Sequence, residues 1–268
     1  MDRIREAVTR ARTDGKPGER TRARTVAHGF GADEVIDGGG FQEVRCDFER
    51  FARNRIISNE QDPVLASYRI LRTRVLQKME TEGWRTLAVI SPNSGAGKTV
   101  TAINLAIAIG SKRGTRALLV DLDFYRPSIS PYLGLKEPPS ILDFLEGKKS
   151  LREVTVKPDL PDMLLIANER LSRKGAEHLT SRRADDLVGC GPTEFGAKVT
   201  IFDMSPVLGC DDSIAFLPKV DCALMIAASG STRASDLKDS MRVIGKTPVI
   251  GTVLNKAPSG FAQREYYY

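Results

Sequence analysis

A glycine-rich stretch with one lysine and one threonine is the clearest candidate for chemistry in this sequence. It reads SPNSGAGKT and occupies residues 91–99. Gly95 and Gly97 allow the backbone to curl so that its amide groups point at phosphate oxygens. Lys98 supplies a cation for the terminal phosphates of a nucleotide, and Thr99 offers a hydroxyl to Mg²⁺. The stretch therefore predicts a phosphate-binding loop.

The residues around this loop have the order that such a site requires. The apolar run TLAVIS (86–91) predicts a strand before it, and TVTAINLAIAIGSK (99–112) predicts a helix whose positive end faces the phosphates. A strict G-x-x-x-x-G-K-[ST] pattern would have glycine where this chain has Pro92. The predicted ATP-binding residues of the loop are Ser94, Gly95, Ala96, Gly97, Lys98, Thr99 and Val100.

Carboxylates follow two further apolar runs. RALLVDLDFYRP places Asp121 and Asp123 two residues apart, and VTIFDMSPVLGCDD places Asp203 directly after a strand candidate. A single aspartate at a strand end is more often a turn or helix cap. Two such strands that accompany a phosphate loop favour carboxylates beside a nucleotide-bound Mg²⁺, where phosphoryl transfer is catalysed.

The elements that must position these residues alternate between apolar strands and helices from Trp84 onward. Continuous Val/Ile/Leu strands separated by helices predict an α/β fold of the P-loop NTPase type, a mostly parallel central sheet with helices on both faces. Such sheets bind ligands beyond the carboxyl ends of their strands. The predicted strands are residues 86–91, 116–121, 163–167, 199–203, 222–228 and 248–255, and the predicted helices between them include 99–112, 175–188 and 233–244.

The chain before the sheet differs in composition. Residues 1–24 contain eight Lys/Arg and four Asp/Glu, a basic stretch that suits either anionic lipid or a solvated surface. We expect a basic helical leader and linker over 1–60, a catalytic domain over 61–257 and a tail over 258–268. FQEVRCDFERFARN (41–54) is a candidate helix, and 61–79 a stronger one.

The whole composition excludes several classes. No apolar run approaches the length of a membrane span, and no signal peptide is present at the start, which favours a cytoplasmic protein. The four cysteines show neither CxxC spacing nor a disulfide-rich pattern. Few aromatic residues interleave the arginines of the leader, so we expect no nucleic-acid partner.

The chain ends in three consecutive tyrosines, Tyr266, Tyr267 and Tyr268, which are half of its six. Pro258 and Gly260 before them discourage regular structure. A terminal tyrosine cluster on such a segment can extend into a neighbouring molecule, so we expect these residues to be phosphate acceptors between subunits.

The phosphate loop, LLVDLDFYRP, VTIFDMSPVLGCDD and the terminal tyrosines together resemble the bacterial tyrosine autokinases (BY-kinases) of capsule and exopolysaccharide export. The resemblance covers about residues 60–268. It implies a protein-tyrosine kinase that uses ATP and Mg²⁺, with Lys98, Asp121, Asp123 and Asp203 in the catalytic set and Thr99, Asp121 and Asp203 around the metal. Asp121 and Asp123 would assist the metal and accept the proton of the incoming phenol.

The same resemblance implies other sites. Asn255 corresponds to a position that reads the adenine edge in related ATPases, although a strand-end turn residue is the alternative. Arg69 and Arg72 match two positions of a helical motif at subunit contacts, but Ala66 stands where that motif has glutamate, and Ser205 replaces a proline. The implied partners are other copies of this chain and a separate membrane polysaccharide co-polymerase whose cytosolic tail activates the kinase and recruits it to the inner face of the plasma membrane.

Two other functions fit part of the sequence. A Min/Par-type positioning ATPase has a similar fold, but its signature lysine would stand where this chain has Asn93. A catalytically weak, nucleotide-responsive regulatory protein is the second alternative, supported by Ala66 and the basic leader.

Overall fold

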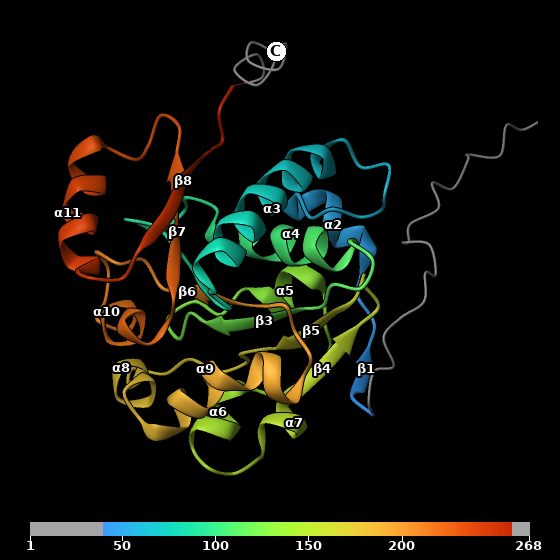
Figure 1. Cartoon of the computed structure of the whole chain (residues 1–268). Helices are drawn as coiled ribbons and strands as arrows, with labels where there is room; N and C mark the ends of the chain where they lie inside the picture. Colours follow the sequence, from blue (N-terminus) through green and yellow to red (C-terminus); the bar gives the residue numbers. More distant parts are fainter. Residues whose placement is uncertain (1–39, 259–268) are drawn as a thin grey trace, which may run out of the picture.

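The computed structural model of the chain describes residues 40–258. The predicted helix at the start of the chain and the three terminal tyrosines lie outside the described residues. Within them, one eight-stranded sheet is the centre of the fold (Figure 1).

The sheet has the strand order β1-β4-β5-β3-β6-β2-β7-β8. All neighbouring strands from β5 to β8 run parallel, and β4 meets β5 in the antiparallel direction. The strands are β1 (Gln42–Val44), β2 (Thr86–Ile90), β3 (Ala117–Leu122), β4 (Thr155–Pro158), β5 (Met163–Ile166), β6 (Val199–Met204), β7 (Cys222–Ala228) and β8 (Val249–Asn255).

The six predicted strands are confirmed within one or two residues at each end, as β2, β3, β5, β6, β7 and β8. β2, β3, β5, β6 and β7 are buried along their whole length. Continuous burial on both faces explains why their sequences are unbroken apolar runs rather than alternating ones.

Residues 41–57 contribute to this fold, although the sequence places them in the linker. Gln42–Val44 form β1, which pairs in parallel with β4, so the first part of the predicted helix over 41–54 is a strand. The second part is helix α2 (Phe48–Asn54), and its Phe51 side chain is fully buried. The folded domain therefore begins before residue 61.

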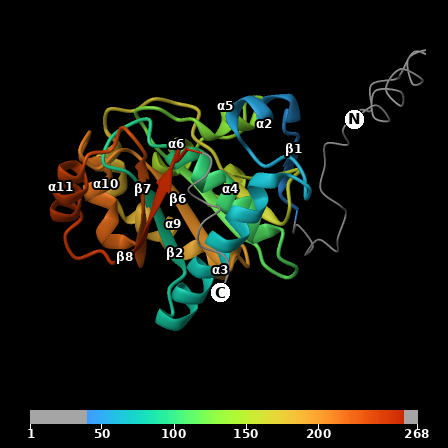
Figure 2. The same ribbon diagram turned by 90° about the horizontal axis from the view of Figure 1, so that it is seen from above.

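Helices cover both faces of the sheet (Figures 1 and 2). On one face lie α2, α3 (Pro63–Glu82), α4 (Lys98–Gly110) and α5 (Ile129–Leu133). The other face is covered by α6 (Ile141–Leu145), α7 (Leu151–Val154), α8 (Gly175–Leu179), α9 (Arg182–Glu194), α10 (Asp212–Phe216) and α11 (Ala234–Ile244). A short 3-10 turn, η1 (Leu217–Lys219), precedes β7.

Two apolar cores result because successive strand residues point to opposite faces. Leu87 and Val89 of β2 pack with α3 and α4, whereas Ala88 and Ile90 pack with the helices of the other face. The sheet thereby receives a layer of helices on each side, as an α/β sheet with parallel strands requires.

The predicted helices at 61–79, 99–112 and 233–244 are confirmed as α3, α4 and α11. The stretch 175–188 forms two helices instead of one, α8 and α9, which are separated at Thr180 and Ser181. Ser181 has extended backbone angles and is the N-cap residue of α9. Among the described residues, no helix combines the length and the hydropathy that a membrane span needs.

Candidate nucleotide-binding site

The predicted phosphate-binding loop connects β2 to α4, in the order that the sequence indicates. Gly95 and Gly97 adopt φ angles of 79° and 94°, in the left-handed region where a side chain would be strained. Pro92 takes the place of the usual first glycine without breaking the loop. Its carbonyl accepts a hydrogen bond from the Leu208 amide at 3.1 Å, which ties the loop to the segment after β6.

Helix α4 begins at Lys98 and has no side-chain cap at its N-terminus. The first amide groups of a helix have no partner inside the helix, and here no side-chain oxygen replaces one. An uncapped start that follows a glycine-rich turn presents these donors and the positive end of the helix dipole to a phosphate group.

A cavity of about 610 Å³ opens beside this loop. It is lined by most of the loop, by Asp123 and Tyr125 after β3, by Ser205 and Pro206 after β6, and by Lys256 after β8. β3, β6, β2 and β7 are consecutive in the sheet, with β8 next at its edge. The cavity thus lies beyond the carboxyl ends of the strands, where parallel sheets bind ligands.

Lys98 and Asp123 face each other in this cavity. The Lys98 ammonium nitrogen lies 3.9 Å from one Asp123 carboxylate oxygen, and both side chains are over nine-tenths buried. The other Asp123 oxygen accepts hydrogen bonds from the Arg126 amide and the Ser205 hydroxyl, both at 3.0 Å. Asp123 is therefore oriented by the protein before any ligand arrives.

Of the three aspartates of the site, Asp203 is the one whose carboxylate accepts no hydrogen bond. It is fully buried, and neither of its carboxylate oxygens has a hydrogen-bond partner. Burial raises its pKa to about 6, and this effect is opposed by the Lys98 ammonium and the nearby Thr99 hydroxyl. A buried carboxylate without partners, beside a hydroxyl and a phosphate loop, fits the requirement of a Mg²⁺ ion that is also held by phosphates.

Asp121 and Asp203 are opposite each other in the neighbouring strands β3 and β6. The Asp121 carboxylate, unlike that of Asp203, accepts hydrogen bonds from backbone amides. One oxygen accepts the Asp123 amide, and the other accepts the amides of Ser128 and Ile129, all at 3.1 Å. Burial and the charge of Asp203 raise its pKa well above the ordinary value. Asp121 thus fixes the loop 123–129, and whether it also contacts a metal stays a prediction.

The structure therefore brings Lys98, Thr99, Asp121, Asp123 and Asp203 close together. Among the described residues, no group of three or more His, Cys, Asp or Glu side chains could hold a metal without other ligands.

Two residues that the sequence did not single out as catalytic line the same cavity. Ser205 donates to Asp123, and its carbonyl accepts the Ser213 hydroxyl at 2.6 Å. Lys256 extends its ammonium group to the Gly95 carbonyl at 2.7 Å. Their positions directly after β6 and β8, at the carboxyl ends of parallel strands, are the signal that could have found them.

Asn255 is the last residue of β8 and lies against the phosphate loop. Its amide nitrogen donates to the Ala96 carbonyl at 2.9 Å, and its amide oxygen accepts the Lys256 amide at 2.8 Å. Both polar atoms of this side chain are thus engaged within the protein. Its predicted contact with an adenine edge stays a prediction.

A second cavity of about 670 Å³ adjoins the first. Both are lined by Gly97, Val100 and Lys256. The second is bordered by α2, α3 and the end of β8, and its lining includes Tyr68 and Leu71. The space beside the loop is therefore larger than a triphosphate needs, and its second part is more apolar.

The two arginines predicted at a subunit contact lie on α3. Arg69 is exposed, whereas Arg72 is half-buried and donates to the Ala108 carbonyl of α4 at 2.9 Å. Burial and the neighbouring Arg69 lower the pKa of Arg72. Ala66, where the resemblance expects glutamate, is exposed on the same helix. At least one of the two arginines thus contributes to packing within the subunit.

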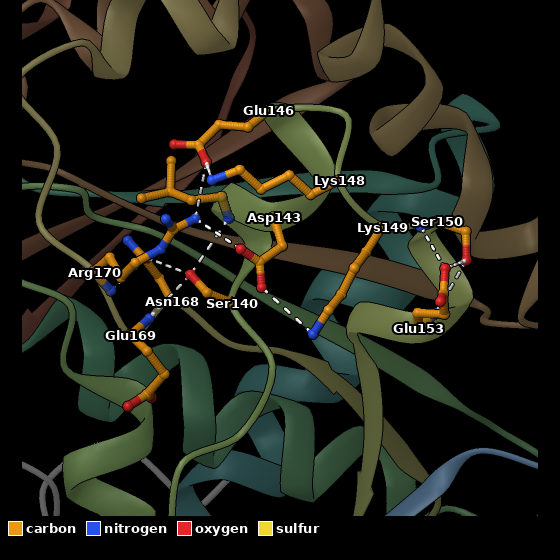
Figure 3. A network of polar contacts seen from close by, with 11 residues as sticks. Ser140, Asp143, Glu146, Lys148, Lys149, Ser150, Glu153, Asn168, Glu169 and Arg170 are labelled. Carbon is orange, nitrogen blue, oxygen red and sulfur yellow. Dashed lines mark hydrogen bonds and ion pairs between the residues drawn. The ribbon is translucent and has the colours of Figure 1, made fainter.

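A polar cluster near α6 is separate from this site (Figure 3). Arg170 bridges Asp143 and Glu146 at 2.9 Å and 3.2 Å, and Lys149 lies 3.5 Å from Asp143. The charges of this cluster are matched by one another on a partly exposed surface. The cluster therefore fastens the loop after β5 to α6, and we assign it no chemistry.

Comparison with known proteins agrees with this geometry. Residues 87–266 match the CobQ/CobB/MinD/ParA nucleotide binding domain. The chain belongs to this family. The CobQ/CobB/MinD/ParA domain thus covers every strand from β2 to β8 except the first residue of β2, and with them the phosphate loop and all three aspartates.

Individual relatives of this CobQ/CobB/MinD/ParA member are similar at low identity. EpsB of Ralstonia nicotianae is 26% identical over 72% of this chain, and the chain spans only 26% of that protein. Tyrosine-protein kinase YwqD of Bacillus subtilis is 24% identical over 81% of this chain and 92% of its own length. The crystal structure of the VpsO kinase domain superimposes with a TM-score of 0.66 at 20% identity, covering 78% of this chain and 98% of that one.

Proposed function

We propose that this chain is an ATP-dependent protein-tyrosine kinase that phosphorylates the tyrosines at its C-terminal end. The observation that carries the proposal is the convergence of Lys98, Asp123 and the unpartnered Asp203 on one phosphate loop. The chain that contains this site ends in three tyrosines. YwqD, which the chain matches over most of both lengths, is named a tyrosine-protein kinase.

The triphosphate of ATP would lie in the first cavity. The uncapped start of α4 and the Lys98 ammonium supply the donors and the positive charge for its phosphates. Thr99 and Asp203 would hold Mg²⁺, which when bound neutralises charge that develops on the transferred phosphoryl group. The adenosine half would extend past Val100 into the second, more apolar cavity.

The acceptor would be a tyrosine hydroxyl, whose ordinary pKa is near 10. At neutral pH its proton must be removed during transfer, and a carboxylate within reach is a suitable base. Asp123 suits this role because it lines the cavity and is held in one orientation by Arg126 and Ser205.

We place this kinase in the regulation of capsule or exopolysaccharide export, as the resemblance of its motifs implies. Transfer between copies of the chain, a membrane co-polymerase as activator and recruitment to the inner face of the plasma membrane belong to the same proposal. Each phosphate would add about −1.5 to −2 charge units. A phosphorylated tail would thus be repelled by the aspartates of the site, so that modified copies separate.

A positioning ATPase is the second candidate because the chain shares its nucleotide-binding family with MinD and ParA. Such an enzyme releases the terminal phosphate to water. In this chain the side chain at the place of the signature lysine, Asn93, donates to Asp236 of α11 at 2.9 Å. That contact turns the Asn93 amide toward α11, and a neutral amide supplies no charge to a phosphate.

The deciding experiment incubates the purified chain with ATP and Mg²⁺ and measures its intact mass. We expect up to three phosphates on residues 266–268, no gain in Lys98→Met, and no gain on the tail when the three tyrosines are replaced by Phe. The Phe variant should still bind nucleotide. With γ-labelled ATP, label that leaves entirely as free phosphate while the mass stays constant would support the ATPase and contradict the kinase.

An activator could be required, so the same assay includes the cytosolic peptide of a candidate membrane partner. A constant mass under every condition, with intact nucleotide binding, would favour the regulatory alternative.

A further inference from the structure

The last residue of β8 and the residue after it both donate hydrogen bonds to the phosphate loop. The Asn255 side chain donates to the Ala96 carbonyl at 2.9 Å, and the Lys256 ammonium donates to the Gly95 carbonyl at 2.7 Å. Two neighbouring residues of one strand end thus bind two consecutive carbonyls of the loop. We call Asn255 and Lys256 the loop latch.

These contacts matter because a phosphate is bound by amide groups, not by carbonyls. Adjacent peptide units in a curled loop can turn either their N–H groups or their carbonyls toward the ligand. Gly95 and Gly97 give this loop the freedom to do both. When the Gly95 and Ala96 carbonyls are held by the Asn255 and Lys256 side chains, the amides of the loop are free to face the phosphates.

The fit between latch and loop is close. A Cβ atom added at Gly97 would lie 2.2 Å from the Asn255 amide nitrogen, so the loop can approach Asn255 only because residue 97 lacks a side chain. A glycine here is therefore required by its neighbour as well as by its φ of 94°.

The latch is itself held in place. The Asn255 amide oxygen accepts the Lys256 amide at 2.8 Å, and the Asn255 carbonyl accepts the Ser229 amide at 2.8 Å. Lys256 adopts a left-handed φ of 57°, which is uncommon for a residue with a side chain. Backbone of this kind persists where the surrounding contacts determine it.

We propose that Asn255 and Lys256 are positioning residues for nucleotide binding, which hold the phosphate loop in its binding shape before the nucleotide arrives. The proposal requires only that the phosphate loop binds a nucleotide, as in the nucleotide-binding family, and it does not require the proposed kinase activity. The two hydrogen bonds of the Asn255 side chain, to the Ala96 carbonyl and from the Lys256 amide, support this role directly.

The test measures the loop without nucleotide. Amide hydrogen exchange of residues 93–98 is compared among wild type, Asn255→Ala, Lys256→Ala and Lys256→Arg. We expect several-fold faster exchange in both alanine variants, unchanged exchange in the core strand β3, and recovery in Lys256→Arg. The dissociation constant of a fluorescent ATP analogue with Mg²⁺ should rise roughly three- to tenfold in each alanine variant, as the loss of one hydrogen bond predicts.

Lys246→Ala is the matched control, because it removes an exposed lysine that precedes β8, at the opposite end of this strand from Lys256, and it should change neither measurement. Weaker nucleotide binding with unchanged exchange in the nucleotide-free loop would overturn the proposal, since Lys256 would then act by direct contact with the nucleotide. Unchanged exchange and unchanged affinity would overturn it as well. If Asn255→Ala does not fold, the two Lys256 variants decide.

Discussion

The Lys98 ammonium and the Asp123 carboxylate lie 3.9 Å apart inside the cavity, and the Ser205 hydroxyl binds the opposite oxygen of that carboxylate at 3.0 Å. Lys98 is the first residue of α4 after β2, whereas Asp123 and Ser205 directly follow β3 and β6, and these three strands are neighbours in the sheet. The orientation of Asp123 thus depends on the Ser205 hydroxyl, at a position where the resemblance expects a proline.

Ser205→Ala removes this hydroxyl and leaves Asp123 with a single amide donor on that oxygen. We expect the turnover number for tail phosphorylation to fall about fivefold to tenfold, with little change in the KM for ATP, because one net hydrogen bond is lost. Steady-state phosphorylation kinetics measure both quantities.

Ser205→Thr keeps the hydroxyl and should retain most of the rate. Ser240→Ala is the matched control, since Ser240 is a buried serine of α11 whose hydroxyl donates to the Asp236 carbonyl within the helix. An alanine at position 205 that leaves the rate unchanged would show that Arg126 alone is sufficient to orient Asp123.

The stability of the nucleotide-free protein should depend on pH through its buried carboxylates. Burial raises the pKa of Asp203 and of Asp212 to about 6, and it raises the pKa of Asp121 well above its ordinary value. In the unfolded chain these groups ionise near pH 4. The native protein therefore binds more protons between about pH 4 and 6, so its stability is highest below that window and falls as the pH rises through it.

We accordingly expect a higher melting temperature at pH 5 than at pH 7, and a smaller difference in Asp203→Asn. Differential scanning calorimetry in the absence of nucleotide measures both. Asp239→Asn, on the exposed face of α11, should leave the difference as in wild type. Equal pH dependence in Asp203→Asn and wild type would mean that Asp203 does not titrate in this range. Mg²⁺-dependent ATP binding should show the opposite trend and weaken below pH 6, since only the ionised form of Asp203 would bind the metal under the proposed function.

Asp121 should matter for stability as well as for activity. Its two oxygens accept three backbone amides of the loop 123–129, and Asp121→Ala leaves those buried donors without partners. We expect the free energy of unfolding to fall by about 2–4 kcal/mol, measured by urea denaturation. Asp239→Ala should change it by less than about 0.5 kcal/mol. A loss as small as that in Asp121→Ala would argue that Asp121 serves the nucleotide rather than the loop.

The two arginines of α3 should separate into different roles. Arg72→Ala removes the hydrogen bond to the Ala108 carbonyl and should lower the free energy of unfolding by about 1 kcal/mol. Arg69 is exposed, so Arg69→Ala should preserve stability but weaken self-association if this residue contacts another copy. Urea denaturation and sedimentation velocity distinguish the two effects. Unaltered self-association in Arg69→Ala would remove the support for a contact at this position.

Much of the fold could be predicted because five of its central strands are buried on both faces and therefore read as unbroken apolar runs. β1 and β4 could not be predicted because they are short and contain no run of apolar residues. β1 has three residues and β4 has four. Gln42 and Glu43 of β1 are exposed at the sheet edge, so no apolar pattern indicates a strand there. The break between α8 and α9 lies at Ser181, whose backbone is extended and whose hydroxyl donates to the His178 carbonyl at 2.6 Å, and an amphipathic pattern alone does not reveal it.

The sequence could predict which of the candidate residues lie close together, but not which contacts each of them makes. Strand-end aspartates and a glycine-rich loop indicate a common location, because the carboxyl ends of parallel strands meet at one edge of the sheet. The sequence cannot show that Asp121 is occupied by backbone amides while Asp203 has no partner, since both are aspartates after apolar runs. The partners of a carboxylate depend on how distant loops return to it.

The described chain ends at Pro258, two residues after the lysine that touches the Gly95 carbonyl. Ten residues separate that point from Tyr268, and a fully extended chain of this length spans at most about 35 Å. Under the proposed function, transfer between copies therefore requires the nucleotide site of one copy to lie within about 35 Å of Pro258 of another. Tail phosphorylation should then saturate as soon as copies associate, and its rate per molecule should rise with protein concentration only below that point.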